Sequence, residues 1–153
     1  DALRELRATL GVLRGVEEDS RAPAPSLARV DDLIAAASAA GVEVRLDVHG
    51  DPRPLPPNVD LAAYRIVQEA LTNVARHAGP TTAVVSLTYG RQDLLVEVSD
   101  QGPGVSAEWR AEAGNGLLGM RERAVAAGGQ LEAGPRPEGG FLVRARLSLQ
   151  GAV

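Results

Sequence analysis

Four polar residues of types that bind ligands fall on one stripe of a predicted helix. Residues 64–77 read YRIVQEALTNVARH, in which Glu69, Asn73 and His77 are spaced i, i+4, i+8. Arg76 lies beside them, and the opposite arc of the helix is apolar, which suits packing on a sheet. A surface helix gains nothing from aligning a carboxylate, an amide, a guanidinium and an imidazole. The stripe therefore indicates a site, although a solvated helix face stays open as the alternative.

A first glycine motif, DQGPG, starts at Asp100 directly after a predicted strand. A carboxylate at a strand end can accept a hydrogen bond from an exocyclic amine such as that of adenine. The glycines at 102 and 104 allow the backbone to approach a ligand. An ordinary turn has the same composition, so the motif alone leaves both interpretations open.

A second glycine motif, GNGLLGMRER, occupies residues 114–123. We expect its glycines to open a helix, whose N-terminal N–H groups and positive dipole end would face phosphate. The motif is not a Walker loop, because the chain contains no lysine. It does not follow the first strand, as the dinucleotide-binding fingerprint would. A flexible loop before a capped helix is the alternative.

These motifs must be positioned by alternating helices and strands. We expect Ser26 to cap a first helix, Asn58 to cap the long central helix, and Gly79-Pro80 to end it. The predicted helices are 26–41, 58–78 and 117–127; the predicted strands are 42–48, 83–89, 94–98, 130–133 and 141–149; residues 99–116 are expected to form a loop. Two hairpins among these strands predict an α/β two-layer sandwich, with a mixed sheet of about five strands and helices on one face.

The N-terminal segment, residues 1–15, has a pattern of apolar residues that differs from that of the rest of the chain. Its leucines at 3, 6, 10 and 13 follow the spacing of a coiled coil or helical bundle, with an amphipathic helix packed on its own domain as the alternative. We expect residues 1–15 to end a helical hairpin, 16–25 to be a linker, 26–149 to be one domain and 150–153 a tail. Because the chain starts at Asp1 within this predicted helix, we expect it to be a fragment of a longer protein.

Composition excludes several classes of protein. The chain of 153 residues has a net charge of −4, which argues against a nucleic-acid partner. It lacks cysteine, so disulfides and thiolate metal sites are excluded. No apolar run approaches the roughly 20 residues of a membrane span. We expect a domain that works in the cytoplasm.

Taken in order, the three motifs resemble a known superfamily. ExxxNxxRH in a helix, DxGxG after a strand and GxGLxGMxER at a helix resemble the N, G1 and G2 boxes of the GHKL ATP-binding superfamily, whose fold is the Bergerat sandwich. RIVQEALTNVARHA and GNGLLGMRERAVAAGG are similar to the DesK-like branch of bacterial two-component sensor histidine kinases. The likeness covers roughly residues 26–149.

The resemblance implies a role for each motif residue. Asn73 would ligate the Mg²⁺ that bridges the ATP phosphates, and Glu69 would position its water shell. Asp100 would hold the adenine amino group. The remaining residues implied to contact ATP are Arg76, His77, Gly102, Gly104, Gly114, Gly116, Leu117 and Gly119. The short segment 105–115 would form the lid.

The implied activity is transfer of the γ-phosphate of Mg-ATP to a histidine in an upstream helical hairpin, for relay to a response regulator. The intact protein would be a homodimer and could carry a membrane anchor. The acceptor histidine is missing, because His49 and His77 match no acceptor site. Gly139-Gly140-Phe141 departs from the usual glycine-threonine, so no ligand contact is assigned there. The alternatives are an anti-sigma-factor serine kinase of the same superfamily and a non-catalytic ATP-binding scaffold.

Overall fold

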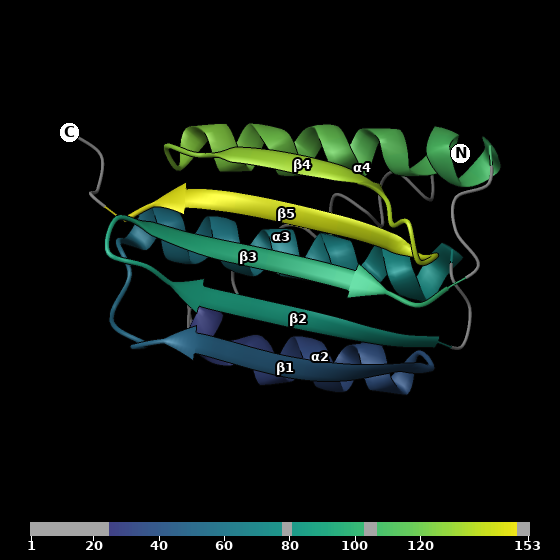
Figure 1. Cartoon of the computed structure of the whole chain (residues 1–153), viewed down its shortest axis with the longest axis horizontal. Coiled ribbons are helices and arrows are strands. Elements are labelled where there is room, and N and C mark those ends of the chain that lie inside the picture. The colour runs from purple at the N-terminus through teal and green to yellow at the C-terminus, as the bar shows by residue number, and fades with distance from the viewer. Residues whose placement is uncertain (1–24, 78–80, 103–106, 150–153) are drawn as a thin grey trace, which may run out of the picture.

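The computed structural model describes residues 25–77, 81–102 and 107–149, with the side chains of 107–115 excepted. A five-stranded sheet forms one layer and the helices form the other (Figure 1). The helical elements are η1 (Leu27–Arg29), α2 (Val30–Ala39), α3 (Pro57–His77) and α4 (Ala107–Ala126). The strands are β1 (Val42–Gly50), β2 (Thr81–Tyr89), β3 (Asp93–Asp100), β4 (Gln130–Pro135) and β5 (Phe141–Ser148).

The strand order is β1-β2-β3-β5-β4. β1 pairs with β2 in parallel, and the other neighbours pair antiparallel, so the sheet is mixed as predicted. Both predicted hairpins, β2–β3 and β4–β5, are confirmed. The parallel pair requires a crossover connection, and α3 is that connection.

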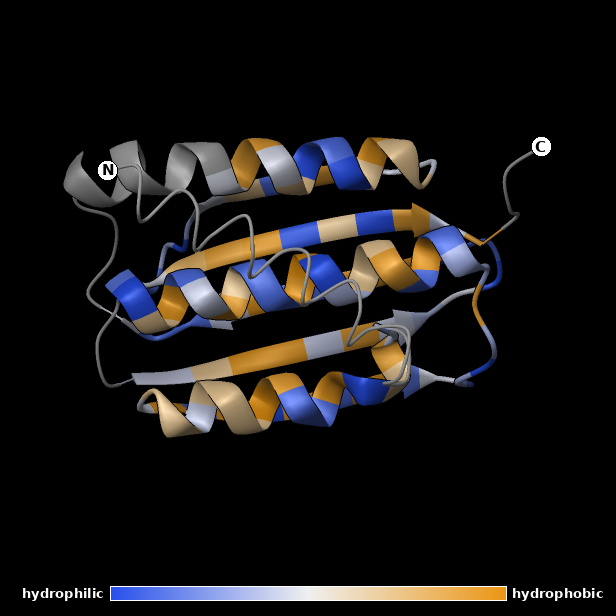
Figure 2. Ribbon diagram, turned by 180° about the vertical axis from the view of Figure 1, so that it is seen from behind, coloured by the Kyte–Doolittle hydropathy of each residue, from blue (hydrophilic) through white to orange (hydrophobic). Residues whose placement is uncertain are grey.

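The three helices lie side by side on one face of the sheet (Figure 2). Alternation along the strands turns one set of side chains toward them, and Val85, Val96 and Leu147 are fully buried there. The apolar arc of α3 supplies Ile66 and Val67 to the same core. This is the packing that the spacing of apolar residues in α3 predicts.

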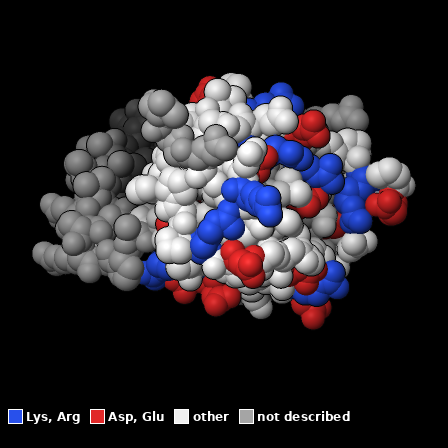
Figure 3. Space-filling view, turned by 60° about the vertical axis from the view of Figure 1, so that its left-hand side comes forward, with Lys and Arg blue, Asp and Glu red and all other residues white. Residues whose placement is uncertain are grey.

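The other face of the sheet carries charged side chains of both signs, which intermix on the surface in Figure 3. Arg144 on β5 bonds the Glu97 carboxylate on β3 with its Nε at 3.1 Å and its Nη2 at 3.0 Å. Arg146 and Asp93 form a second cross-strand pair at 3.7 Å. Exposed pairs of this kind add little to stability, but they favour the strand register that brings opposite charges together.

Element boundaries lie within about two residues of the predicted ones, except at the start of α4. Ser26 caps the first helical turn as predicted, its hydroxyl accepting from the Ala28 N–H at 3.2 Å. α3 begins at Pro57 rather than after an Asn58 cap, because proline is well suited to the first turn of a helix.

The prediction of a loop over residues 99–116 is wrong for its second half. β3 runs to Asp100, and α4 starts at Ala107. The segment AEWRAEA at 107–113 consists mostly of strong helix formers, and their propensity outweighs the glycines that follow. Gly114 and Gly116 consequently lie inside α4 and do not open it.

The predicted hairpin segment 1–15, the linker through residue 24, the Gly79-Pro80 stop and the tail 150–153 lie outside the described residues. The division of the chain into these parts stays a prediction. Within the described ranges, none of the helices has the length and apolarity needed to cross a bilayer.

Candidate functional site

Segments that are distant in the sequence meet at one end of the sheet. The C-terminal end of α3, the end of β3, the start of α4 and the β4–β5 turn all lie at the right-hand end in Figure 1. The C-terminal half of α3 carries the polar stripe and the end of β3 carries DQGPG, while GNGLLGMRER lies further along α4, from residue 114. The fold therefore gathers them, and it adds the β4–β5 turn, which the sequence analysis did not select.

Two polar side chains are buried among the described residues, and both were selected from the sequence. Asn73 on α3 is 5% exposed and Asp100 at the end of β3 is 6% exposed. A buried polar group costs free energy unless it is hydrogen-bonded, so such groups are kept where they serve a purpose.

Asn73 carries an unmet hydrogen-bonding group. Its Nδ2 is buried and has no hydrogen-bond partner. An unsatisfied buried donor costs about 1–3 kcal/mol, which a core position with only a structural role would not retain. The amide is thus a candidate for contact with a ligand.

Gly116 brings α4 against the polar stripe of α3. A Cβ built on Gly116 would lie 2.6 Å from Glu69 Oε1 and 3.6 Å from Asn73 Nδ2. Only glycine permits this approach without moving the Glu69 carboxylate. The second glycine motif and the stripe are therefore in contact, but through the body of α4, and not through a helix N-terminus as predicted.

The Asp100 carboxylate is held by backbone N–H groups. Its Oδ1 accepts from the Gly102 N–H at 2.8 Å, and the Phe141 N–H also bonds the carboxylate. Burial raises the pKa of Asp100 above its ordinary value, while the two N–H groups and the nearby Arg136 act in the opposite direction. A carboxylate accepts about four hydrogen bonds, so capacity for a ligand amine remains.

The other predicted residues vary in position. Arg76 is exposed at the end of α3, and His77 next to it is half-buried. Leu117 packs against the core, and Gly119 faces the Arg123 guanidinium of its own helix. Gly114 is described only by its place within α4, and Gly104 lies outside the described residues.

A cavity of about 530 Å³ lies on the opposite, charged face of the sheet, lined by residues of β3, β4, β5 and the β4–β5 turn, such as Arg144 on β5 and Arg136 in the turn. It includes neither Asn73 nor Asp100, and we do not assign the predicted site to it.

Comparison with known proteins identifies the family. Residues 58–151 match the family of histidine kinase-, DNA gyrase B-, and HSP90-like ATPases, a match that includes more than half of the chain. The chain belongs to this ATPase family. The GHKL resemblance drawn from the three motifs is thereby confirmed, and so is the expected ATP-binding fold.

Relatives of this ATPase domain are sensor kinases. The chain is 41% identical over 92 residues to sensor histidine kinase YxjM of Bacillus subtilis, covering 60% of this chain and 22% of that protein. It is 36% identical over 110 residues to sensor histidine kinase LnrJ of the same organism, covering 72% of this chain and 27% of that protein. It thus spans about a quarter of the length of these curated relatives.

A solved structure agrees with the fold of the ATPase domain. The blue-light activated histidine kinase EL346 of Erythrobacter litoralis superposes with a TM-score of 0.63 at 21% identity, covering 82% of this chain and 45% of that one. Membership of the narrower DesK-like branch stays a prediction.

Proposed function

We propose that this chain is the ATP-binding catalytic domain of a sensor histidine kinase. In the intact protein it transfers the γ-phosphate of Mg-ATP to a histidine in a helical hairpin, from which a response regulator takes it. The observation that carries the proposal is that Asn73 and Asp100, which the motif resemblance matches to the N and G1 boxes, are the two buried polar side chains of the described residues in a chain of this ATPase family.

The residues at this end of the sheet fit Mg-ATP. Mg²⁺ bound with ATP takes most of its ligands from phosphates and water, so one amide oxygen from Asn73 is a sufficient protein contribution. Glu69, which lies with Asn73 against Gly116, is placed to orient a metal-bound water. The half-satisfied Asp100 carboxylate suits the adenine amine. Arg76, exposed at the end of α3, supplies positive charge for phosphate.

In phosphoryl transfer the protein contributes little covalent chemistry. Catalysis depends on positioning and on stabilising charge, and the bound metal neutralises the phosphate oxygens. The role of the chain's own residues is therefore to hold the two ends of the nucleotide. We propose that Asn73 serves at the phosphate end and Asp100 at the base end.

Two other activities use the same residues. If Glu69 activated water as a general base, the isolated chain would hydrolyse ATP rapidly. An anti-sigma-factor serine kinase would form acid-stable phosphoserine, whereas the intact histidine kinase forms acid-labile phosphohistidine. The sensor kinase relatives favour the histidine kinase. We further propose, on the same ground, a homodimeric intact protein whose catalytic domain works in the cytoplasm.

Calorimetric titration of the chain with ATP, with and without Mg²⁺, tests the proposal. We expect saturable binding that strengthens with Mg²⁺, because Asn73 would hold the metal and the metal would supply positive charge for the phosphates. Trp109 is the only tryptophan and lies in the segment 105–115 that the resemblance implies to be the lid, so its fluorescence offers a second readout. Absence of binding to the wild-type chain would contradict the proposed function.

The close contact at Gly116 gives a further prediction. In Gly116→Ala, a methyl group would displace the Glu69 carboxylate beside Asn73, so we expect Mg-ATP affinity to fall about tenfold. Alanine is the better helix former by about 1 kcal/mol, which offsets the displacement and leaves the free energy of unfolding nearly unchanged.

Gly134→Ala on β4 is the matched control for this variant, since a Cβ there meets nothing within 4 Å. Both variants are compared by calorimetry and urea unfolding. Equal ATP affinity in Gly116→Ala and Gly134→Ala would show that the contact at Gly116 does not serve the site.

A further inference from the structure

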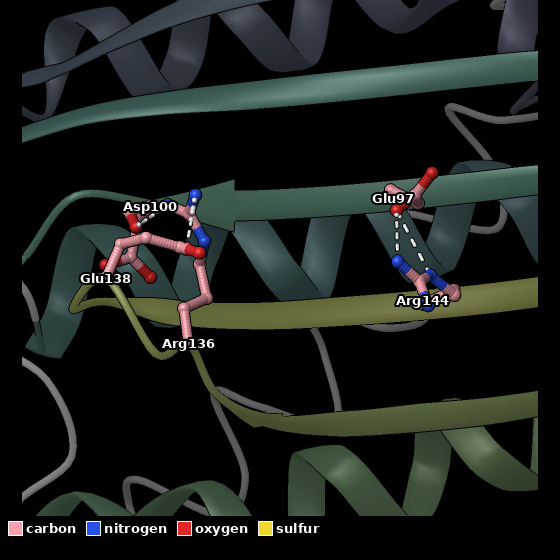
Figure 4. A network of polar contacts seen from close by, with 5 residues as sticks. All are labelled: Glu97, Asp100, Arg136, Glu138 and Arg144. Carbon is pink, nitrogen blue, oxygen red and sulfur yellow. Dashed lines mark hydrogen bonds and ion pairs between the residues drawn. The ribbon is translucent and has the colours of Figure 1, made fainter.

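The β4–β5 turn, residues 136–140, lies beside the C-terminal end of β3 and contacts the backbone of Asp100. Arg136 Nη1 donates to the Asp100 carbonyl oxygen at 3.0 Å, a contact between residues 36 positions apart (Figure 4). The Phe141 N–H, at the start of β5, bonds the Asp100 carboxylate. One turn thus holds both the backbone and the side chain of Asp100.

Gly140 lets the turn come this close. Its φ is +83°, and a Cβ there would lie 1.9 Å from the Asp100 carbonyl oxygen, so any side chain would force the turn away. The backbone of Asp100 and that of Gly140 are in direct contact. The position of the turn and the position of Asp100 are therefore set together.

Arg136 is itself fixed in place. Its N–H donates to the Gly140 carbonyl at 3.0 Å, and its carbonyl accepts from the Gly139 N–H at 3.0 Å. Glu138 pairs with its Nη2 at 3.2 Å, and the Arg136 side chain is only 21% exposed. The backbone of Arg136 is held by two hydrogen bonds and its guanidinium by the Glu138 carboxylate, so Nη1 is directed toward Asp100.

We propose that Arg136 is a positioning residue for Asp100, and that through it the β4–β5 turn sets the preference of the site for 6-aminopurine over 6-oxopurine nucleotides. The proposal rests on the proposed function, in which Asp100 accepts a hydrogen bond from the adenine amine. A 6-oxopurine presents an acceptor in place of that amine, so a fixed carboxylate rejects it. A carboxylate that is free to turn away discriminates less.

The positive charge of Arg136 contributes in the same direction. It favours the ionised form of Asp100, opposing the burial that raises the pKa of this carboxyl group. In the ionised form both carboxylate oxygens accept hydrogen bonds and neither donates, which suits an amine.

The test compares ATP and ITP binding to the 153-residue chain by calorimetry. We expect the wild-type chain to prefer ATP by about 10- to 100-fold, the range for one hydrogen bond to a charged group. In Arg136→Ala, ATP affinity should fall about tenfold while ITP affinity is unchanged. Arg136→Lys keeps the positive charge but has one ammonium nitrogen in place of the guanidinium. It should restore part of the preference for ATP over ITP.

Arg144→Ala is the matched control, because Arg144 lies on the same face and is paired with Glu97 but not with Asp100. It should leave both affinities unchanged. Arg136→Ala added to Asp100→Asn should have no further effect on ATP affinity, since the two residues act in one unit. Thermal unfolding of every variant verifies that it is folded.

The outcomes separate the two proposals. A wild-type chain that binds neither nucleotide overturns the proposed function and this inference with it. Binding that is lost in Asp100→Asn, together with an unchanged ATP:ITP ratio in Arg136→Ala, overturns only the role of Arg136. Equal weakening of ATP and ITP by Arg136→Ala also overturns it, because a merely structural residue would act on both.

Discussion

Asn73→Ala will abolish Mg-ATP binding, or weaken it at least about 100-fold, without destabilising the fold. The amide is the group that the proposed site offers to the metal, and alanine has no ligand atom to replace it. The expected retention of stability has a physical reason. Asn73 is buried with its Nδ2 unpaired, so its removal relieves a cost of about 1–3 kcal/mol that offsets the small cavity left behind.

The measurements are calorimetric titration with Mg-ATP and urea unfolding of the same preparation. Asn58→Ala is the control: it changes the same residue type on the same helix, at the exposed opposite end of α3. Wild-type affinity for Mg-ATP in the Asn73→Ala variant would contradict the assignment of this residue to the metal site. A loss of both binding and fold would instead assign Asn73 to the core.

Asp100→Asn will lose ATP binding by about 10- to 100-fold and gain stability at neutral pH. Asparagine keeps an oxygen for the Gly102 N–H but presents an amide where the adenine amine needs an acceptor. The gain in stability follows from the raised pKa of Asp100, whose first cause is burial. Asparagine carries no charge to bury.

The direction of the pH dependence follows from linkage. Because the pKa is higher in the folded state, the folded chain binds more protons than the unfolded chain between the ordinary and the raised value. The free energy of unfolding therefore falls as pH rises through that window, and the penalty is fully present above the raised pKa. Below the ordinary pKa of aspartate it is absent.

Urea unfolding of wild type and Asp100→Asn at several pH values between about 4 and 7.5 checks this expectation. The difference in unfolding free energy should grow in favour of the variant as pH rises. A variant that is less stable than wild type at neutral pH would show that the ionised carboxylate is a net stabilising group in the fold.

Much of this site could be predicted because it interrupts regular patterns. Asn73 stands in a helix whose spacing of apolar residues is otherwise clear, and Asp100 ends a strand of alternating residues. Local patterns of this kind determine which side of an element faces the core. The two hairpins were predictable for the same reason, because their strands are close in sequence and joined by turn residues.

The residues that were missed depend on distant contacts. Arg136 is an ordinary arginine in its own turn, and only the pairing of β5 with β3 brings it to Asp100. The glycine doublet at 139 and 140 marked an unusual backbone, but not its neighbour. The early start of α4 was missed because the glycines were weighted above the helix formers before them.

The crossover of α3 between β1 and β2 has a consequence for the order of assembly. The β2–β3 and β4–β5 hairpins join strands that are neighbours in the sequence. Val42 on β1 pairs with Thr81 on β2, and the whole of α3 lies between them in the sequence. Pairings that close long loops form late, because the loop loses conformational entropy before the stabilising contacts are made. We therefore expect the hairpins to form early in refolding, and the parallel β1–β2 pair and the β3–β5 pair that joins the two hairpins to form later. Since Asn73 belongs to the connecting helix and Asp100 to the first hairpin, competence to bind nucleotide should emerge in the slow step, together with closure of the parallel pair.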